Sequence, residues 1–474
     1  MSNCCTPRDE ASYDLIVIGA GSAGFSAAIT AAEQGVRVAL IGYGTIGGTC
    51  VNVGCVPSKT MIRAAEALHG ARAASRFQGI TGEAHISDWR ALIADKDELV
   101  TTLRNKKYID LLSAYETIDY IEGAARITEY GVIVGDRSIY AEKTIIATGS
   151  SVSVPQIPGI EETLYLTSTT ALELEQLPKS LMVAGGGYIG CELAQMFARA
   201  GTKVSIVTRS RLIPEAEPEI SEALTEYFKA EGIVVRRGLK YVRTEKSVEG
   251  VSLTISVDGQ EQTLNAERLL LTTGRNANIG SLGLEEAGIE TLPNGGIVVD
   301  DRMRTSKPSV YAAGDVTGRD QFVYMAAYGA KLAAKNALNG NSHVYENAAM
   351  PWVVFTDPQV AGAGLSERQA KEAGFNVKTS IAPLDQVPRA LAARDTRGLI
   401  KLVADADTDC LLGAQILAPE GADSIQTIVL ALRHNMTATE LGEMIFPYLT
   451  TVEGLKLAAQ GFGKDVTKLS CCAG

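Results

Sequence analysis

Six of the eight cysteines in this chain of 474 residues occur in close pairs. The pairs are Cys4 with Cys5, Cys50 with Cys55, and Cys471 with Cys472. Eight cysteines are too few for a disulfide scaffold at this length, and without a secretion signal such cysteines more often serve catalysis or metal binding. Cys191 and Cys410 stand alone, and we expect both to be small buried hydrophobic residues.

Cys50 and Cys55 lie in the segment GGTCVNVGCVPSK, residues 47–59. In a regular helix, residues five positions apart point about 140° away from each other, so a disulfide between them would be strained. We therefore expect an irregular backbone around Gly54, before Pro57 begins or bends a helix. A disulfide held in this way is easily reduced, which suits a redox-active pair. The alternative interpretation is two unrelated buried cysteines.

Two segments of the chain combine a buried strand, a glycine-rich turn and a helix. Their glycines are Gly19, Gly21 and Gly24 in the first segment, and Gly185, Gly187 and Gly190 in the second. The GxGxxG pattern alone is weak evidence, but at a strand-to-helix turn inside a βαβ unit it predicts a dinucleotide site. The glycines let the backbone approach a pyrophosphate, which then lies at the helix N-terminus. Two such units predict two dinucleotides.

The residue that ends the second strand of such a unit indicates which ribose is bound, because an acid favours a free 2′-hydroxyl. In the second unit this residue is Thr208, and Arg209 and Arg211 follow it. We therefore expect NADPH rather than NADH, the alternative being that both arginines are merely solvated. In the first unit the position holds Gly42, and the sequence does not indicate what replaces the acid.

Length and charge exclude several classes of protein. A chain of this length predicts two or three domains. The net charge of −11 argues against nucleic acid as a partner. The uncharged run from Leu15 to Ala32 approaches the length of a membrane span, but it is rich in small residues and follows acidic ones. We expect a buried strand and helix there, and a cytoplasmic protein with no membrane span.

The segment GGTCVNVGCVPSK, together with the two glycine motifs, resembles the signature of the class I pyridine nucleotide-disulfide oxidoreductases, which are flavoproteins. The resemblance extends over essentially the whole chain. It implies an α/β fold with two Rossmann-like dinucleotide-binding domains and an α+β C-terminal dimerisation domain. The implied domains are residues 1–152 and 273–345 for FAD, 153–272 for NADPH, and 346–474 for the interface.

The resemblance also implies roles for individual residues. Positions that line FAD in the family match Gly19, Gly21, Gly24, Gly44, Thr49, Lys59, Ala125, Thr148, Gly149, Asp315 and Val323. The NADPH site is assigned to Gly185, Gly187, Gly190, Arg209 and Arg211. Cys55 would contact the flavin and Cys50 would exchange with substrate. Lys59 would lie near flavin N5 with Glu192 as its partner, and Tyr188 would cover the flavin and give way to nicotinamide.

One departure from the family's pattern lies near the C-terminus. Members that reduce disulfides carry His-Pro followed by Glu, whereas this chain has Tyr448 and Leu449, with Glu453 retained. A phenol normally titrates near pH 10 and is a poor proton shuttle for dithiol chemistry. The four histidines, none of which fits this position, are His69, His85, His343 and His434. Reduction of lipoamide or glutathione is therefore not expected.

Thiolates bind soft metal ions, and the predicted metal ligands are Cys50, Cys55, Cys471 and Cys472. In mercury(II)-reducing members of the family, a terminal pair collects Hg(II) and delivers it to the redox pair of the other subunit. The resemblance thus implies a homodimer with shared active sites, Tyr448 acting in trans, and Hg(II) arriving as a thiol complex. The expected reaction is reduction of Hg(II) to Hg(0) by NADPH through FAD, a detoxification.

Two other functions stay open at this point. One is a disulfide reductase similar to dihydrolipoyl dehydrogenase, and the other is a non-catalytic flavoprotein that binds or carries mercury. The chain is expected to lack the additional N-terminal metal-binding domain of many mercury(II)-reducing members. Cys4 and Cys5 would then be either an auxiliary thiol site or part of a terminus without a role.

Overall fold

The computed structural model describes residues 12–464 except residue 130, and these residues divide into two units. Unit 1 comprises residues 12–58, Ala91–Ser153 and Gly274–Glu346. Unit 2 comprises Lys59–Arg90, Val154–Thr273 and residues 347–464. Helices α3 (Cys55–Arg72) and α4 (Trp89–Arg104) contribute residues to both units. The assignment of FAD, NADPH and interface domains to segments of the chain stays a prediction.

Unit 1 is built on a sheet with the strand order β3-β2-β1-β6-β5-β4, in which β17 also pairs with β6. Its strands are β1 (Ser12–Ile18), β2 (Val38–Gly42), β3 (Ile118–Glu122), β4 (Ala125–Ile127), β5 (Val132–Val134), β6 (Arg137–Ile146) and β17 (Val310–Ala312). Strands β1, β2, β3, β6 and β17 run parallel. Strand β5 pairs antiparallel with β6, and β4 pairs antiparallel with β5. Strands β2 and β17 are apolar and buried along their whole length, as expected where both faces of a parallel sheet are covered.

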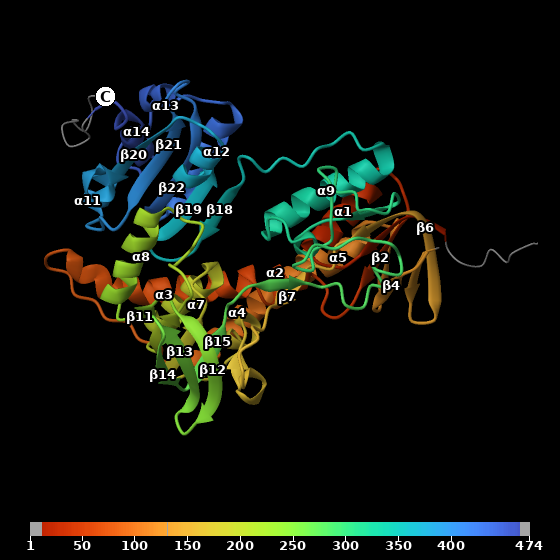
Figure 1. The fold of residues 1–474 in the computed structure, drawn as a ribbon, viewed down its shortest axis with the longest axis horizontal. Coiled ribbons are helices and arrows are strands. Elements are labelled where there is room, and N and C mark those ends of the chain that lie inside the picture. The colour runs from red at the N-terminus through yellow and green to blue at the C-terminus, as the bar shows by residue number, and fades with distance from the viewer. Residues whose placement is uncertain (1–11, 130, 465–474) are drawn as a thin grey trace, which may run out of the picture. The chain divides into compact units, whose positions relative to one another are not determined.

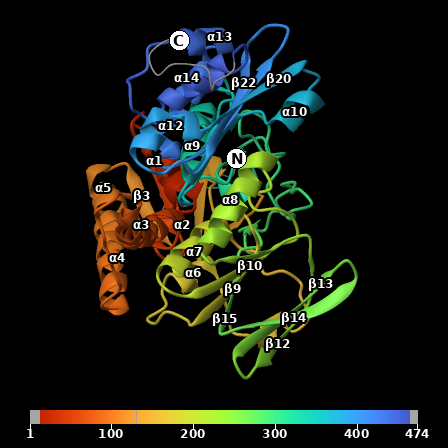
Figure 2. The same ribbon diagram turned by 90° about the vertical axis from the view of Figure 1, so that its left-hand side faces the viewer.

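Helix α1 follows β1 and packs against α9, beside which it lies in Figures 1 and 2. The remaining elements of unit 1 are α1 (Ser22–Ala32), α2 (Gly48–Asn52), the π-helical turn η2 (Asn105–Ile109), α5 (Asp110–Ala114), β7 (Ser150–Val152), β16 (Arg275–Ala277), the 3₁₀ turn η4 (Asp315–Thr317) and α9 (Val323–Asn339). The uncharged run from Leu15 to Ala32 forms the predicted buried strand and helix. Within residues 12–464, leaving out residue 130, every helix falls short of what a membrane-spanning helix requires.

The first part of unit 2 repeats the βαβ plan in a parallel sheet with the order β11-β10-β9-β15-β8. The three strands of an antiparallel sheet, β12-β13-β14, lie in the sequence between β11 and β15 of this parallel sheet. The elements are η1 (Ala73–Arg76), η3 (Ile160–Glu162), β8 (Tyr165–Leu166), α6 (Ser168–Ala171), β9 (Ser180–Ala184), α7 (Tyr188–Arg199), β10 (Lys203–Val207), α8 (Pro218–Ala230), β11 (Val234–Arg236), β12 (Lys240–Ser247), β13 (Gly250–Val257), β14 (Gln260–Ala266) and β15 (Arg268–Leu271).

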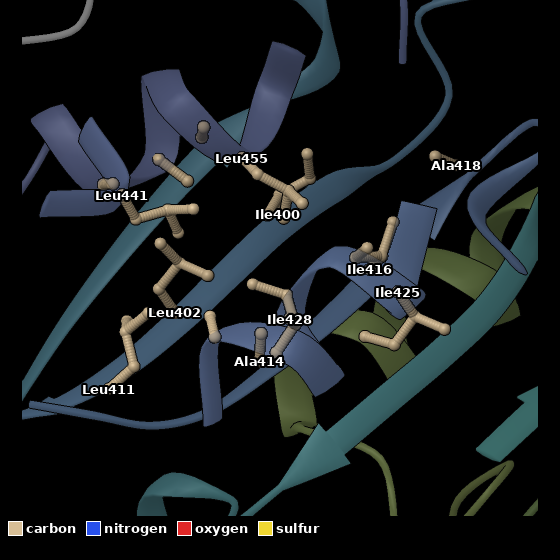
Figure 3. Packing of buried hydrophobic residues seen from close by; sticks show 14 of the residues in the cluster. Ile400, Leu402, Leu411, Ala414, Ile416, Ala418, Ile425, Ile428, Leu441 and Leu455 are labelled. Atoms are coloured by element: carbon tan, nitrogen blue, oxygen red, sulfur yellow. The ribbon is translucent and has the colours of Figure 1, made fainter. Parts of the chain in front are cut away.

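The C-terminal part of unit 2 is an antiparallel sheet, β18-β19-β22-β21-β20, covered by helices. Its elements are β18 (Pro351–Val354), β19 (Gln359–Gly364), α10 (Glu367–Glu372), β20 (Val377–Pro383), η5 (Leu384–Gln386), α11 (Pro388–Ala392), β21 (Leu399–Asp405), β22 (Leu411–Ala418), α12 (Gly421–Arg433), α13 (Ala438–Glu443) and α14 (Glu453–Gln460). Figure 3 shows its core, where Ile400 and Leu402 of β21 lie among side chains of α12, α13 and α14.

A buried ionic cluster joins the two parts of unit 2. Lys401, on β21, is 1% exposed, and its Nζ lies 3.1 Å from Glu217 Oε2, 3.0 Å from Glu219 Oε1 and 2.8 Å from Glu367 Oε2. Glu217 and Glu219 stand at the start of α8, and Glu367 begins α10. Burial acts to lower the pKa of Lys401, but its hydrogen bonds to Glu367 and Glu219 outweigh this and raise the pKa. The lysine therefore stays charged and offsets three carboxylates.

Candidate functional site

The segment that carries Cys50 and Cys55 is irregular where the sequence predicts it. Helix α2 ends at Asn52 and α3 begins at Cys55, so Val53 and Gly54 lie outside both helices. A Cβ atom on Gly54 would lie 2.9 Å from the Thr49 carbonyl oxygen, which shows how closely the chain approaches itself here. Both cysteines are half-buried, and Asn52 fixes α2 by donating to the Ile46 and Gly48 carbonyls.

The segment that carries Cys50 and Cys55 packs directly on the first glycine-rich turn. The Gly47 N–H donates to the Ala20 carbonyl at 2.8 Å. A Cβ atom on Gly48, whose φ is +67°, would lie 2.7 Å from Gly21 Cα. Glycine alone tolerates this backbone and this close approach, so Gly48 can contact the turn that precedes α1. Cys50 follows Gly48 by two residues and is held close to that turn.

The first glycine-rich turn has the geometry of a pyrophosphate site. Gly19 has φ +116°, and a Cβ atom there would lie 2.2 Å from the Ala147 carbonyl oxygen at the end of β6. A Cβ atom on Gly24 would lie 1.7 Å from the Gly19 carbonyl oxygen. Gly21 is the N-cap of α1 and offers no side-chain cap, so the helix N-terminus keeps backbone N–H groups for an anion. These residues fit a dinucleotide.

Other residues that the sequence assigns to FAD also belong to unit 1, with the exception of Lys59. Asp315, which begins η4, accepts a hydrogen bond from Ser150 Oγ at 2.7 Å. Thr148 Oγ1 donates to the Asn278 carbonyl at 2.8 Å, and the Asn278 N–H donates to the carbonyl of Gly149. Of the others, Gly44 and Thr49 are exposed, Ala125 is buried in β4, and Val323 begins α9.

Gly42, the last residue of β2, has no room for a side chain. A Cβ atom there would lie 2.5 Å from the hydroxyl oxygen of Tyr120, on the neighbouring strand β3. Burial, together with the nearby carboxylate of Glu122, raises the pKa of Tyr120. The phenol of Tyr120 therefore lies beside the position where the family pattern places an acid.

Tyr108 is a residue of this region that sequence reasoning missed. It lies on the π-helical turn η2, its hydroxyl is 3.1 Å from Ser22 Oγ, and its ring meets Phe25 edge to face at 4.9 Å. Burial raises the pKa of Tyr108, and negative charge on Cys50 and Cys55 adds to the shift. No spacing pattern marks Tyr108 in the sequence, because a single tyrosine in an amphipathic helix has many possible roles.

The second glycine-rich turn, in unit 2, has the same geometry as the first. Gly185 has φ +116°, and a Cβ atom there would lie 2.4 Å from the Thr272 carbonyl oxygen at the end of β15. A Cβ atom on Gly190 would lie 2.3 Å from the Gly185 carbonyl oxygen. Gly187 is the N-cap of α7 and leaves that helix without a side-chain cap. This turn also fits a dinucleotide.

The residues assigned to the 2′-phosphate follow β10. Thr208 is buried and Arg209 is exposed. Arg211 is half-buried, and its Nη2 donates to the carbonyls of Pro214 at 2.9 Å and Ala216 at 2.6 Å. Arg211 therefore holds the loop before α8, which leaves Arg209 as the arginine better placed to meet a phosphate.

Lys59 and Glu192 form an ion pair within unit 2. Lys59 Nζ lies 2.7 Å from Glu192 Oε2, and it lies 5.0 Å from the centre of the Phe355 ring. The other carboxylate oxygen of Glu192 accepts the Phe355 N–H at 2.9 Å. Because Glu192 is 5% exposed, these two donors compensate the burial of its charge.

Tyr188, the first residue of α7, stacks on Trp352 of β18. The ring centres lie 5.6 Å apart with an angle of 19° between the planes. Trp352 is a second residue that sequence reasoning missed, because 164 positions separate it from Tyr188 and no motif includes it.

Tyr448, the residue in place of the family's histidine, is 51% exposed. Leu449 has φ +62°, an unusual value for leucine, and its N–H donates to Glu453 Oε2 at 3.2 Å. Glu453 is 7% exposed. The acid that the family pattern pairs with histidine therefore supports the turn that carries Tyr448.

The prediction of burial for the two isolated cysteines is confirmed for one and wrong for the other. Cys191 is fully buried, as predicted, and burial raises the pKa of its thiol. Cys410 is half-buried, so its predicted burial is wrong; it lies beside a turn, 3.8 Å from the Asn435 carbonyl. The pairs Cys4 with Cys5 and Cys471 with Cys472 lie outside the described residues.

Comparison with known proteins covers nearly the whole chain. The family model described as pyridine nucleotide-disulphide oxidoreductase matches residues 13–334, and that of its dimerisation domain matches residues 350–459. A mercuric reductase from Lysinibacillus sphaericus is 46% identical over 98% of this chain and 85% of its own. One from Streptomyces lividans is 45% identical over 98% of both chains.

Among solved structures, the HOCl-induced flavoprotein disulfide reductase RclA from Escherichia coli, as its Cu(II) complex, superimposes with a TM-score of 0.84. It is 30% identical, and the match covers 95% of this chain and 99% of that one.

Proposed function

Because this chain belongs to the pyridine nucleotide-disulphide oxidoreductase family, we propose that it reduces Hg(II) to Hg(0) with electrons from a pyridine nucleotide. The observation that carries the proposal is its similarity, over 98% of its length, to relatives named mercuric reductase. Tyr448 at the position of the histidine supports the same choice, because disulfide reduction needs a group that shuttles protons.

The cofactors of the proposed reaction are FAD at the glycine turn of unit 1 and NADPH at the turn of unit 2. A flavin supplies two-electron transfer between a nicotinamide and a dithiol. The pyrophosphates would lie at the N-termini of α1 and α7. Asp315, Thr148, Gly149, Gly44, Thr49, Ala125 and Val323 are the further residues that we assign to the FAD site. Arg209 supports NADPH over NADH through its exposed charge at the end of β10.

Cys50 and Cys55 are the proposed redox-active dithiol and the ligands of Hg(II) during reduction. Two thiolates displace the small-molecule thiolates with which Hg(II) arrives, and these leave as free thiolates. Transfer of one electron pair to the bound ion then breaks both Hg–S bonds, gives neutral Hg(0) and restores two thiolates. The ion pair with Glu192 holds the Lys59 ammonium in one position.

Substrate delivery is assigned to Cys471 and Cys472, which would pass Hg(II) to the redox pair of a second subunit. A homodimer agrees with the match to a dimerisation domain. It also agrees with the exposed apolar side chains of the C-terminal part, which would be covered by a partner: Leu430, Met444, Ile445, Tyr448 and Leu449. We also propose a cytoplasmic location, since a reducing compartment maintains dithiols.

The test is oxidation of NADPH by the purified FAD-containing protein, with Hg(II) in excess small thiol as substrate and with release of mercury vapour measured in parallel. We expect turnover with Hg(II) and none with oxidised lipoamide or glutathione. Turnover with a disulfide and none with Hg(II) would instead identify a disulfide reductase. Replacing Cys471 and Cys472 by Ala should leave FAD reduction intact and slow Hg(II) turnover when free thiol is scarce.

A further inference from the structure

The aromatic stack in unit 2 lies where a dinucleotide would meet the protein. Tyr188 directly follows Gly187, the N-cap of α7, so a pyrophosphate at that helix N-terminus would lie against residue 188. Tyr188 also precedes Glu192 by four positions, so both lie on the face of α7 that Lys59 of α3 contacts through Glu192. Arg209, in contrast, lies at the end of β10, where the adenosine half is expected.

Trp352 limits the position of the Tyr188 ring. The near-parallel rings, 5.6 Å apart at 19°, are offset-stacked, an arrangement that aromatic pairs favour. Tyr188 is half-buried and could otherwise populate several side-chain rotamers. Trp352, which is 9% exposed and lies on a strand, favours one of these rotamers without excluding the others.

Trp352 is itself fixed by a glycine on the neighbouring strand. In the antiparallel pair of β18 and β19, Trp352 lies opposite Gly362. A Cβ atom on Gly362 would lie 2.4 Å from Trp352 Cζ2 and 2.5 Å from Cε2. The indole thus lies flat over the backbone of β19, in space that any other residue at position 362 would occupy.

The chain that follows β18 is anchored to α7 at successive turns of the helix. The Phe355 N–H donates to Glu192, the Asp357 N–H donates to Gln195 at 2.8 Å, and Asp357 Oδ2 lies 2.8 Å from Arg199 Nη2. The stack of Trp352 on Tyr188 is the first contact in this row. Strand β18 and the chain that follows it therefore contact both the Tyr188 ring and the carboxylate of Glu192.

We infer that Trp352 is a positioning residue, which holds Tyr188 as one wall of the site for the nicotinamide half of the dinucleotide. The inference rests on the proposed use of NADPH. Trp352 acts through Tyr188, and Gly362 makes room for the indole. We therefore expect the fluorescence of the indole to change when the nucleotide binds.

The test is NADP⁺ binding to the FAD-containing protein, measured by calorimetry and by tryptophan fluorescence. The chain has two tryptophans, so Trp89→Phe leaves Trp352 as the single one. Trp89 packs against Phe197, away from the stack, so we expect its replacement to leave the stack in place. We expect NADP⁺ to change the emission of Trp352 with the dissociation constant found by calorimetry. Trp352→Leu, which removes the ring, should weaken NADP⁺ binding by about 2- to 10-fold, the factor that matches one aromatic pair. Trp352→Phe keeps a ring and should stay within about 2-fold of wild type.

Adenosine 2′,5′-bisphosphate, which lacks the nicotinamide half, provides the control. Its affinity should be the same in wild type and Trp352→Leu, whereas general damage to unit 2 would weaken both ligands. Gly362→Ala should reproduce Trp352→Leu, because its methyl group displaces the indole. Equal NADP⁺ affinities for Trp352→Leu and wild type, or equal losses for both ligands, would overturn the inference. Failure of wild type to bind NADP⁺ would instead refute the proposed reductant.

Discussion

Replacing Lys401 by Met tests how strongly one buried charge holds unit 2 together. In the variant, the carboxylates of Glu217, Glu219 and Glu367 remain close together, but the ammonium group that they share is gone. Glu217 is only 4% exposed, so water cannot replace the lost cation there. Removal of one partner from a buried ion pair costs about 3–5 kcal/mol, because the remaining charge stays desolvated. For a unit of this size we expect Tm to fall by roughly 6–10 °C.

The matched control is Lys371→Met, which removes another lysine from the same Glu367. Lys371 Nζ lies 2.6 Å from Glu367 Oε1 but is 59% exposed. An exposed pair one helical turn apart contributes about 0.5 kcal/mol or less, so Tm should change by about 1 °C. Differential scanning calorimetry of the three proteins, all loaded with FAD, measures both differences.

Acid provides a second test of the same cluster. Hydrogen bonds from Lys371 and Lys401 lower the pKa of Glu367 to about 2 from its ordinary value of 4.5. A carboxyl with a lowered pKa contributes stability above pH 4.5 that is lost as the pH falls toward 2. Lys401→Met lacks part of this contribution, so the difference in Tm between the variant and wild type should narrow as the pH falls from 4.5 toward 2. A gap that widens, or one no larger than that of Lys371→Met, would refute the reasoning.

Three further changes test the nucleotide sites and the C-terminal turn. Gly24→Ala would place a Cβ atom 1.7 Å from the Gly19 carbonyl oxygen, so the protein should purify without FAD, measured by its visible absorbance. Arg209→Ala should raise KM for NADPH by about 10-fold and leave KM for NADH unchanged, as expected for the loss of one charged hydrogen bond to a 2′-phosphate. Glu453→Ala removes the acceptor of the Leu449 N–H and should cost about 1–2 kcal/mol in thermal unfolding, whereas Glu453→Gln, which keeps an acceptor oxygen, should cost less.

The sequence predicts the parts of this fold that local chemistry determines. Gly19 and Gly185 end buried strands before helices, and both have the same positive φ in the structure. The interruption at Gly54 follows from the spacing of two cysteines and a proline. These features depend on neighbours in the chain, so their residue types are informative by themselves.

Features that depend on distant partners could not be predicted in this way. Tyr120 fills the space beside Gly42 only because β3 pairs with β2, and the sequence shows just the absence of an acid. Trp352 requires Gly362 across a strand pair and Tyr188 on a helix from another part of the chain. The family resemblance supplied the pairing of Lys59 with Glu192, which spacing alone does not indicate.

The packing of α1 against α9 has a consequence for the order in which the chain folds during synthesis. Unit 1 begins with β1 and α1, but β17 and α9, which complete its sheet and cover α1, come about 300 residues later. The parallel sheet of unit 2, from β8 to β15, lies entirely between them. On the ribosome we expect that sheet to form while β1 and α1 still lack β17 and α9 as packing partners. The nascent chain should then retain a flavin only after Asn339, the last residue of α9, has emerged.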